Sequence, residues 1–347
     1  MAGADSRRNV ECRHMKILVV RRDNIGDLVC TTPLISALRR RHPDAWIGAL
    51  VNSYNAPVLQ NNPDLDEVIA YTKLKHLEEG DRALAALGRR LGALWRLRRS
   101  GLDLVILATP DASAKLLRIA RLLKPARIAG FSDGSVAGLD YAVSTASLAG
   151  RHEVERVYAL APLLTLDRDP PPLRMVPDAA QVEKAAEAFP RGARRIAVHI
   201  SARRPLQRWP AASYVALIRR LRAEHDAGIL LLWSPGPADD PKHPGDDDKA
   251  RAILDQAGST GVAGYATRRL EELIGALAAS DAVICSDGGA MHVAAALGKP
   301  IVCFFGDSPV ERWHPWGVPH RVLRPAAGSV AEVPVEHAAA AFSSLVQ

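Results

Sequence analysis

Two aspartates in this sequence stand between a short apolar run and a helical pattern, where a carboxylate can cap a helix or do chemistry. Asp27 lies in VVRRDNIGDLVCTTPLISAL (19–38), and Asp287 lies in SDGGAMHVAAALGKP (286–300). An aspartate at the start of a helix accepts backbone N–H bonds. At the carboxyl end of a strand it also faces a ligand cleft, where Asp27 could serve as a general base. The residues alone leave both interpretations of Asp27 open.

The residues that follow Asp287 are typical of a phosphate-binding turn. Gly288 and Gly289 would let a ligand approach the backbone closely, and we expect a helix to start near Ala290. Free N–H groups and the positive dipole end at a helix N-terminus attract anions. His292, in the first turn, could donate a hydrogen bond to a pyrophosphate oxygen. A tight turn with a capping aspartate and a buried histidine is the alternative.

A basic loop, HISARRPLQRWPAASYVAL (199–217), is a second candidate for binding anions. Arg203, Arg204 and Arg208 lie within six residues of one another in it. Guanidinium groups match the geometry of phosphate, so the three could form an anion clamp. Three solvated loop arginines are the alternative.

An acidic loop, SPGPADDPKHPGDDD (234–248), follows the next predicted strand. Its Asp239 and Asp240 could accept hydrogen bonds from sugar hydroxyls of a nucleoside, or they are solvated surface residues. No group of carboxylates, histidines or cysteines has metal-ligand spacing. We therefore expect neither a metal ion nor another cofactor.

The elements that would position these loops alternate between strands and helices. In the first half, short apolar runs suited to buried parallel strands are separated by helical patterns. This order predicts a doubly wound parallel sheet. A dinucleotide-binding sheet would have G-x-G-x-x-G in its first turn, whereas this turn has only Gly26. The predicted strands are 16–20, 46–51, 66–71, 103–108 and 126–131, and the predicted helices include 33–41 and 83–99.

The same alternation restarts after a Pro-rich break at 167–178, where three consecutive prolines can neither continue a helix nor join a central strand. Two α/β domains would enclose a cleft between the carboxyl ends of their sheets. The second set of predicted strands is 194–200, 228–233, 281–285 and 301–306 with a short strand near Gly261, and its helices are 212–225, 268–280 and one from about Asp248. The expected division is a disordered extension (1–14), a first domain (15–168), a linker (169–178), a second domain (179–332) and a C-terminal helix that packs back over the hinge (333–347).

The net charge of +7 is confined to the first half of the chain. Residues 1–168 hold 25 Lys and Arg against 18 Asp and Glu, whereas residues 169–347 hold 20 of each. Either basic helix faces are solvated there, or this half meets an anionic partner such as phosphorylated lipid, a membrane surface or nucleic acid. An aromatic share of 5% and the lack of an RNA-binding or helix-turn-helix motif argue against nucleic acid.

Composition argues against several other classes. No apolar run reaches the length of about eighteen residues that would predict a transmembrane helix. The N-terminus lacks the apolar stretch of a signal peptide. The cysteines show no C-x-x-C spacing, so we expect no zinc site or disulfide, a reducing cytoplasm, and a core role for Cys285 and Cys303.

The chain resembles glycosyltransferase family 9, the ADP-heptose:lipopolysaccharide heptosyltransferases. The resemblance rests on RRDNIGDLVCTTPLISALR (21–39), QRWP (207–210) and SDGGAMHVAAALGKPIVCFFGDSPVERWHPWG (286–317), and it spans nearly the whole chain from Met15. It implies a GT-B architecture, in which two Rossmann-like doubly wound parallel-sheet domains face one another across a cleft. The first domain would bind the acceptor and the second the nucleotide-sugar.

The resemblance also implies roles for individual residues. Asp27 matches the aspartate proposed as the general base that deprotonates the acceptor hydroxyl. Asp287 matches the aspartate that holds hydroxyls of the donor sugar. Gly289 and His292 match the turn that binds the donor diphosphate.

Two positions depart from the family pattern. Gln207 stands where the family often has a lysine that contacts donor phosphate and sugar, so one of the arginines nearby would have to supply that charge. Gly288 stands where the family often has Ser or Thr, and one hydroxyl is thereby lost. The candidates for the missing charge are Arg203, Arg204 and Arg208.

These features predict an inverting, metal-independent glycosyltransferase that moves a heptose or related sugar from a nucleotide-sugar, most simply ADP-heptose, to a hydroxyl of the lipopolysaccharide inner core. The expected partners are the donor, an anionic glycolipid acceptor and the inner face of the cytoplasmic membrane. A sugar-nucleotide epimerase or hydrolase of GT-B fold is one alternative. A non-catalytic module that binds a nucleotide-sugar is another.

Overall fold

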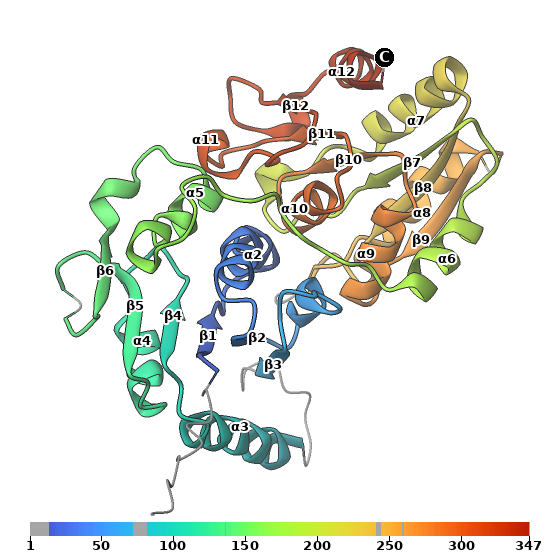
Figure 1. Ribbon diagram of the computed structural model, residues 1–347. Coiled ribbons are helices and arrows are strands. Elements are labelled where there is room, and N and C mark those ends of the chain that lie inside the picture. The colour runs from blue at the N-terminus through green and yellow to red at the C-terminus, as the bar shows by residue number, and fades with distance from the viewer. Residues whose placement is uncertain (1–13, 72–81, 136, 241–243, 259, 347) are drawn as a thin grey trace, which may run out of the picture.

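Two parallel six-stranded sheets, one from each half of the chain, organise the molecule (Figure 1). The computed structural model describes residues 14–71, 82–135, 137–240, 244–258 and 260–346. The strand order is β3-β2-β1-β4-β5-β6 in the first sheet and β12-β11-β10-β7-β8-β9 in the second. Counted from its own first strand, each sheet therefore has the same doubly wound order, as the sequence predicts.

The strands are short, and each lies close to a predicted apolar run where one was predicted. β6 and β12 are edge strands of the two sheets, and neither is predicted from the sequence. The first sheet consists of β1 (Lys16–Val20), β2 (Trp46–Asn52), β3 (Glu67–Tyr71), β4 (Leu104–Leu107), β5 (Arg127–Ser132) and β6 (Tyr141–Ser144). The second consists of β7 (Arg194–His199), β8 (Ala227–Trp233), β9 (Val262–Ala266), β10 (Ala282–Ser286), β11 (Ile301–Phe304) and β12 (His320–Leu323).

Strand β1 shows why such apolar runs form the centre of the sheet. Its side chains alternate between the two faces, because successive residues of a strand point in opposite directions. Ile17 and Val19 belong to one core cluster, and Leu18 and Val20 belong to another. A strand covered by helices on both faces needs apolar residues at every position.

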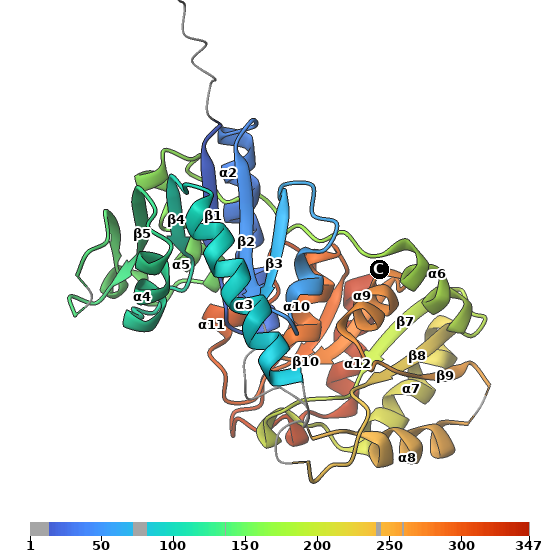
Figure 2. The ribbon, with the colours of Figure 1, turned by 90° about the horizontal axis from the view of Figure 1, so that it is seen from below.

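We call each sheet together with the helices that pack on it a unit, the first formed by the first half of the chain and the second by the second half. The helices of the first unit cover both faces of its sheet (Figure 2). α3 and α4 share a core with one face, and α1, α2 and α5 share a core with the other. Ser113 caps α4 by accepting a hydrogen bond from the N–H of Leu116. The helices are α1 (Ile25–Val29), α2 (Thr32–Arg41), α3 (Arg82–Arg99), α4 (Ala114–Leu122) and α5 (Glu153–Tyr158).

The second unit repeats this arrangement. α7, α8 and α12 share one core cluster, which centres on the buried Trp209. The indole N–H of Trp209 donates to the backbone oxygen of Val333 at 2.9 Å, and its ring packs 4.7 Å from that of Phe304. The helices are α6 (Ala179–Ala188), α7 (Ala211–His225), α8 (Asp247–Ala257), α9 (Leu270–Ala278), α10 (Gly289–Ala296), α11 (Val310–Trp313) and α12 (Val335–Val346).

The C-terminal helix lies elsewhere than expected. α12 packs on α7, β11 and β12, and Phe342 is fully buried in the core of the second unit. The sequence predicts that this segment packs back over the hinge. In the structure its apolar face packs instead on the second sheet. Cys285 and Cys303 are buried core residues, as predicted. None of the helices within the described stretches is long and apolar enough to cross a membrane.

Candidate active site

The two units meet where α1, which follows β1, packs against α10, which follows β10. Two glycines allow this close approach. A Cβ atom at position 26 would lie 2.4 Å from Cδ2 of His292, and one at position 289 would lie 3.2 Å from Cβ of Ile25. The contact therefore requires the small residues Gly26 and Gly289. It brings the start of α1, which carries Asp27, to the turn before α10, which carries Asp287.

Asp27 is held by hydrogen bonds on both of its carboxylate oxygens. Oδ2 accepts from the backbone N–H and from the side-chain amide of Asn24, each at 3.0 Å. The bond from the backbone N–H of Asn24 is the Asp27 half of a capping box at the start of α1, so the carboxylate does cap the helix. Oδ1 accepts from the guanidinium of Arg21 at 2.6 Å. The residue is 8% exposed and is therefore nearly buried.

Arg21 is the centre of a buried charge network beneath Asp27. Its guanidinium lies 2.6 Å from Asp27, 2.8 Å from Glu153 and 3.0 Å from Asp23, and the residue is 1% exposed. A buried charge is tolerated only when it is paired and hydrogen-bonded. Burial alone would lower the pKa of Arg21, but the charges of Asp27, Glu153 and Asp23 outweigh it and raise the pKa.

Glu153 connects this network to the second unit. Its side chain is fully buried, and its Oε2 lies 2.9 Å from Nε of Arg312 on α11 and 3.3 Å from Nε of Arg156. Its Oε1 is the oxygen that pairs with Arg21. Glu153 and Arg312 could not be predicted as site residues, because nothing in the local sequence shows a pairing between residues 159 positions apart.

The ring of His292 lies between the two units. The residue is 3% exposed, its Nδ1 lies 3.8 Å from Sγ of Cys30, and its ring packs edge-on against Trp313. Burial lowers the pKa of His292 to about 4, so the ring is neutral near pH 7. The predicted hydrogen bond from His292 to a diphosphate stays a prediction; in this arrangement its side chain packs against Gly26 of the first unit.

Asp287 is positioned by the basic loop of the second unit. The side-chain amide of Gln207 donates to Oδ2 of Asp287 at 2.8 Å and to Oγ of Ser308 at 2.9 Å. Burial raises the pKa of Asp287, although hydrogen bonds from Ser308 and Gln207 and the charge of Arg204 oppose the shift. The amide of Gln207 thus takes the position of the family lysine, and among the described residues no cation forms an ion pair with Asp287.

The backbone at Gly288 gives a physical reason for the second departure. Gly288 is the N-cap of α10 and has a φ of +152°, a conformation that L side chains rarely adopt. A Ser or Thr in this backbone conformation would be strained, even though no atom lies within 4 Å of the place for its Cβ.

The three arginines of the basic loop make different contacts in the structure, and their role as an anion clamp stays a prediction. Arg204 forms an ion pair with Asp307 and donates to Oγ of Ser308 at 3.3 Å. Arg208 donates from Nε to the backbone oxygen of Ala202 at 2.8 Å. Arg203 is exposed, and its charge acts on Tyr54 of the first unit, whose pKa burial nevertheless raises to about 12.

Lys249 is a further cation near this loop that the sequence analysis did not identify. It lies in the first turns of α8, and its Nζ donates to the backbone oxygen of Ile200 at 3.2 Å. Burial lowers its pKa to about 8, and the charge of Arg208 adds to the effect. Asp239 and Asp240 lie between β8 and α8, at the same edge of the sheet.

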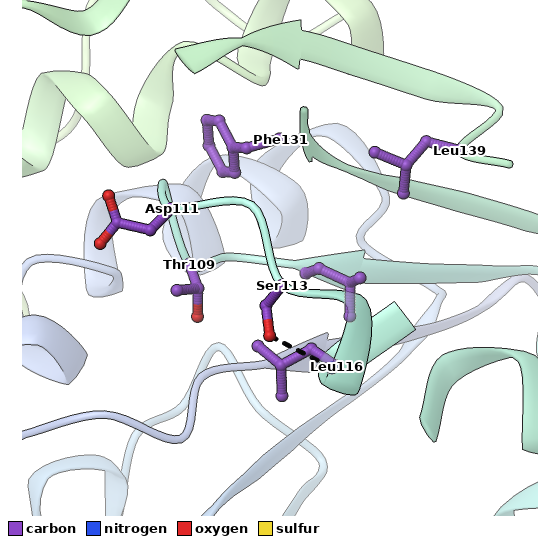
Figure 3. Close-up of a pocket in the computed structure, with 7 residues that line it drawn as sticks. Thr109, Asp111, Ser113, Leu116, Phe131 and Leu139 are labelled. Atoms are coloured by element: carbon purple, nitrogen blue, oxygen red, sulfur yellow. Dashed lines mark hydrogen bonds between the residues drawn. The ribbon is translucent and has the colours of Figure 1, made fainter. Parts of the chain in front are cut away.

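A small hollow opens at the carboxyl edge of the first sheet, beyond β4 and β5 (Figure 3). Thr109 joins it to the charge network, because its hydroxyl donates to Asp23 at 3.0 Å. Its lining residues are Leu107, Thr109, Asp111, Ser113, Leu116, Phe131 and Leu139. Among the described residues, no group of three or more His, Cys, Asp or Glu side chains is placed to hold a metal ion.

Comparison with known proteins gives a consistent match. Residues 91–337 match the family described as glycosyltransferase family 9 (heptosyltransferase). Lipopolysaccharide heptosyltransferase 2 of Salmonella typhimurium is 28% identical over 90% of this chain and 89% of its own length.

Two solved structures share the fold. The glycosyltransferase family 9 protein of Veillonella parvula superposes with a TM-score of 0.79 at 18% identity, over 95% of this chain and 97% of its own. E. coli ADP-heptose LPS heptosyltransferase II does so with a TM-score of 0.75 at 22% identity, over 95% and 98%. The predicted GT-B architecture is therefore confirmed.

Proposed function

Because the chain belongs to glycosyltransferase family 9, we propose that it transfers a heptose from ADP-heptose to a hydroxyl of the lipopolysaccharide inner core. Membership of the family makes it a glycosyltransferase. The donor and the acceptor are inferred from what its relatives are named for, the lipopolysaccharide heptosyltransferases and the ADP-heptose enzyme of E. coli.

The observation that supports this proposal best is the contact between the N-terminal turns of α1 and α10. Ile25 and Gly289 touch there. Asp27 follows Ile25 by two residues along the chain, and Asp287 precedes Gly289 by two. In an inverting transfer, the acceptor oxygen attacks the anomeric carbon while a base on one side removes its proton and the diphosphate leaves on the other. This junction would supply the base from one unit and the donor site from the other.

Asp27 would be the general base. Within the described part of the chain, Oδ2 accepts two hydrogen bonds, both from Asn24, whereas Oδ1 accepts one, from Arg21. A carboxylate oxygen has two lone pairs. The second lone pair of Oδ1 is therefore the one that would take the proton of the acceptor hydroxyl.

The loops of the second unit would hold the donor. The N–H groups at the start of α10, around Gly289, would bind the diphosphate. Asp287 would accept hydrogen bonds from hydroxyls of the sugar. Developing charge on the leaving diphosphate needs positive groups close by. Arg203 is exposed and its charge reaches Tyr54 of the first unit, and Lys249 lies near the basic loop, so these two are the cations that we assign to the diphosphate.

The polar residues around the hollow at the edge of the first sheet would contact the acceptor. Their hydroxyl and carboxylate groups, Thr109, Asp111 and Ser113, are suited to carbohydrate (Figure 3). A lipid-anchored acceptor would also bring the enzyme to the inner face of the cytoplasmic membrane. Neither an epimerase or hydrolase nor a non-catalytic module has an observation that favours it over transfer.

The test is an assay with ADP-heptose and a lipopolysaccharide core that lacks heptose. The proposal predicts release of ADP together with a glycosylated core, and a smaller thermal shift with UDP- and GDP-sugars than with ADP-heptose. Conversion of the donor without any acceptor would instead indicate an epimerase or hydrolase. Binding of ADP-heptose with no turnover under any condition would indicate a binding module.

A further inference from the structure

The two helices that cover the outer face of the first sheet carry only positive charge. α3 has six arginines and no acid in its 18 residues, and α4 has two arginines and a lysine and no acid in its nine. Both pack on the same core cluster, through Leu97 of α3 and Leu116 and Leu117 of α4. This face points away from the second unit (Figures 1 and 2).

Large apolar side chains are exposed on the same two helices. Leu91 is 57% exposed, Trp95 is 59% exposed one helical turn later, and Leu122 at the end of α4 is 60% exposed. The guanidinium of Arg99 lies 4.4 Å from the centre of the Trp95 ring. Arg98 donates to the backbone oxygen of Leu122 at 2.6 Å, which joins the C-terminal ends of the two helices. Exposed apolar groups set among charges mark an interaction surface.

We propose that this face, formed by the outward residues of α3 and α4, docks the protein on an anionic lipid bilayer. Arginine and lysine bind the lipid phosphates, while tryptophan and leucine enter the boundary between headgroups and acyl chains. The inference rests on the proposed function only in that a lipid-anchored acceptor gives the docking a purpose. The charge and the exposed side chains stand without it.

The charge of the face argues for a lipid surface over a second copy of the chain. Two such faces brought together would place like charges opposite one another, which is unfavourable at low ionic strength. An anionic bilayer offers the opposite charge and an apolar layer beneath it. The face therefore fits a membrane in both of its chemical properties.

The topology places one end of this face at the edge of the sheet that carries Asp27. α3 follows β3 along the chain and therefore begins at the carboxyl edge of the first sheet, the edge at which β1 leads to Asp27. Docking along α3 would hold that edge near the bilayer surface. A hydroxyl on a lipid-anchored core could then reach the base without the lipid leaving the membrane.

Vesicle binding of the full-length protein tests the inference. The protein should sediment with vesicles of phosphatidylcholine and phosphatidylglycerol, weakly with phosphatidylcholine alone, and less as salt increases. Arg99→Glu should weaken binding by about fivefold or more, because each basic residue near such a surface contributes on the order of 1 kcal/mol. Trp95→Ala and Leu91→Ser should also weaken it. Leu163→Ser is the matched control, since Leu163 is 40% exposed and lies outside α3 and α4.

Transfer assays separate this inference from the proposed function. Trp95→Ala and Leu91→Ser should leave transfer to a detergent-free, deacylated core acceptor unchanged and reduce transfer to acceptor embedded in vesicles. Wild-type protein that binds anionic vesicles but transfers to no acceptor would overturn the proposed function and leave the docking face standing. Equal binding to neutral and anionic vesicles, unchanged binding by the variants, or self-association abolished by Trp95→Ala in sedimentation velocity would each overturn the docking proposal.

Discussion

Arg312 and Glu153 form an ion pair that joins the two units of the protein. Nε of Arg312, on α11 of the second unit, lies 2.9 Å from Oε2 of Glu153, which is fully buried in the first unit. The other oxygen of Glu153 pairs with Arg21, and Arg21 pairs with Asp27. The position of the second unit is thus connected through three charged contacts to the carboxylate proposed as the base.

Glu153→Gln should therefore destabilise the protein and impair transfer. It leaves Arg21 and Arg312 without their shared charge partner, and removal of one member of a buried ion pair costs about 3 kcal/mol. Urea unfolding measures the stability, and steady-state kinetics should show a larger fall in kcat than rise in KM for the donor. Arg251→Gln is the control, because its pair with Asp248 is exposed and should contribute less than about 1 kcal/mol.

Gly26→Ala should separate α1 from α10. Its Cβ would lie 2.4 Å from Cδ2 of His292, so the helix or the ring must move. We expect a loss of transfer of about a hundredfold, since small misplacements of reacting groups have such effects. His292→Ala in the same chain should restore part of the activity by making room. Gly88→Ala, on an open face of α3, should be neutral or slightly stabilising. Equal activity of Gly26→Ala and wild type would show that the contact is not needed.

Gln207→Ala should weaken donor binding. The side-chain amide donates to both Asp287 and Ser308. Its loss removes the 2.8 Å hydrogen bond to Asp287 and leaves the carboxylate with the hydrogen bond from Ser308. We expect the dissociation constant of ADP-heptose, measured by calorimetry, to rise about tenfold, in line with about 1.5 kcal/mol for a hydrogen bond to a charged group. Gln207→Glu should be worse, because it places two carboxylates together. Unchanged donor affinity in both variants would remove Gln207 and Asp287 from the donor site.

Buried histidines should make the protein less stable in acid. Burial lowers the pKa of His152 to about 3 and that of His292 to about 4, below the value of about 6.5 in an unfolded chain. Between about pH 6.5 and 4 the unfolded state binds more protons than the folded state, so the free energy of unfolding falls as the pH decreases. Each histidine contributes a slope of up to about 1.4 kcal/mol per pH unit. Thermal unfolding of His292→Gln should show a shallower dependence over this window, and a slope equal to that of wild type would contradict the assignment.

The sequence predicts the sheets well because buried parallel strands need apolar residues at every position. Apolar runs such as KILVV are typical of buried strands. The loops that follow these strands lie at the carboxyl edge of the sheet, where ligands bind. β6 escaped prediction because it lies at the edge of its sheet and half of its residues are exposed. The C-terminal helix was placed wrongly because an apolar face does not show which surface it will cover.

The sequence predicts only those site residues that can be recognised from their own turns. Asp27 and Asp287 could be found from their positions after strands, and the resemblance supplied their expected roles. The partners of these residues could not be found, because they come from distant parts of the chain. Arg204 looked like a phosphate ligand, yet its pairing with Asp307 across 103 positions follows only from the fold.

The role of Asp27 as the general base is tested most directly by comparing donor binding with transfer in Asp27→Asn. The change keeps the shape of the side chain and removes its ability to accept a proton. We predict that ADP-heptose binds with an affinity within about twofold of wild type, while transfer to the heptose-free core falls by at least about a hundredfold, the lower range for loss of a general base. Transfer at a rate close to that of wild type would contradict the assignment of Asp27 as the base.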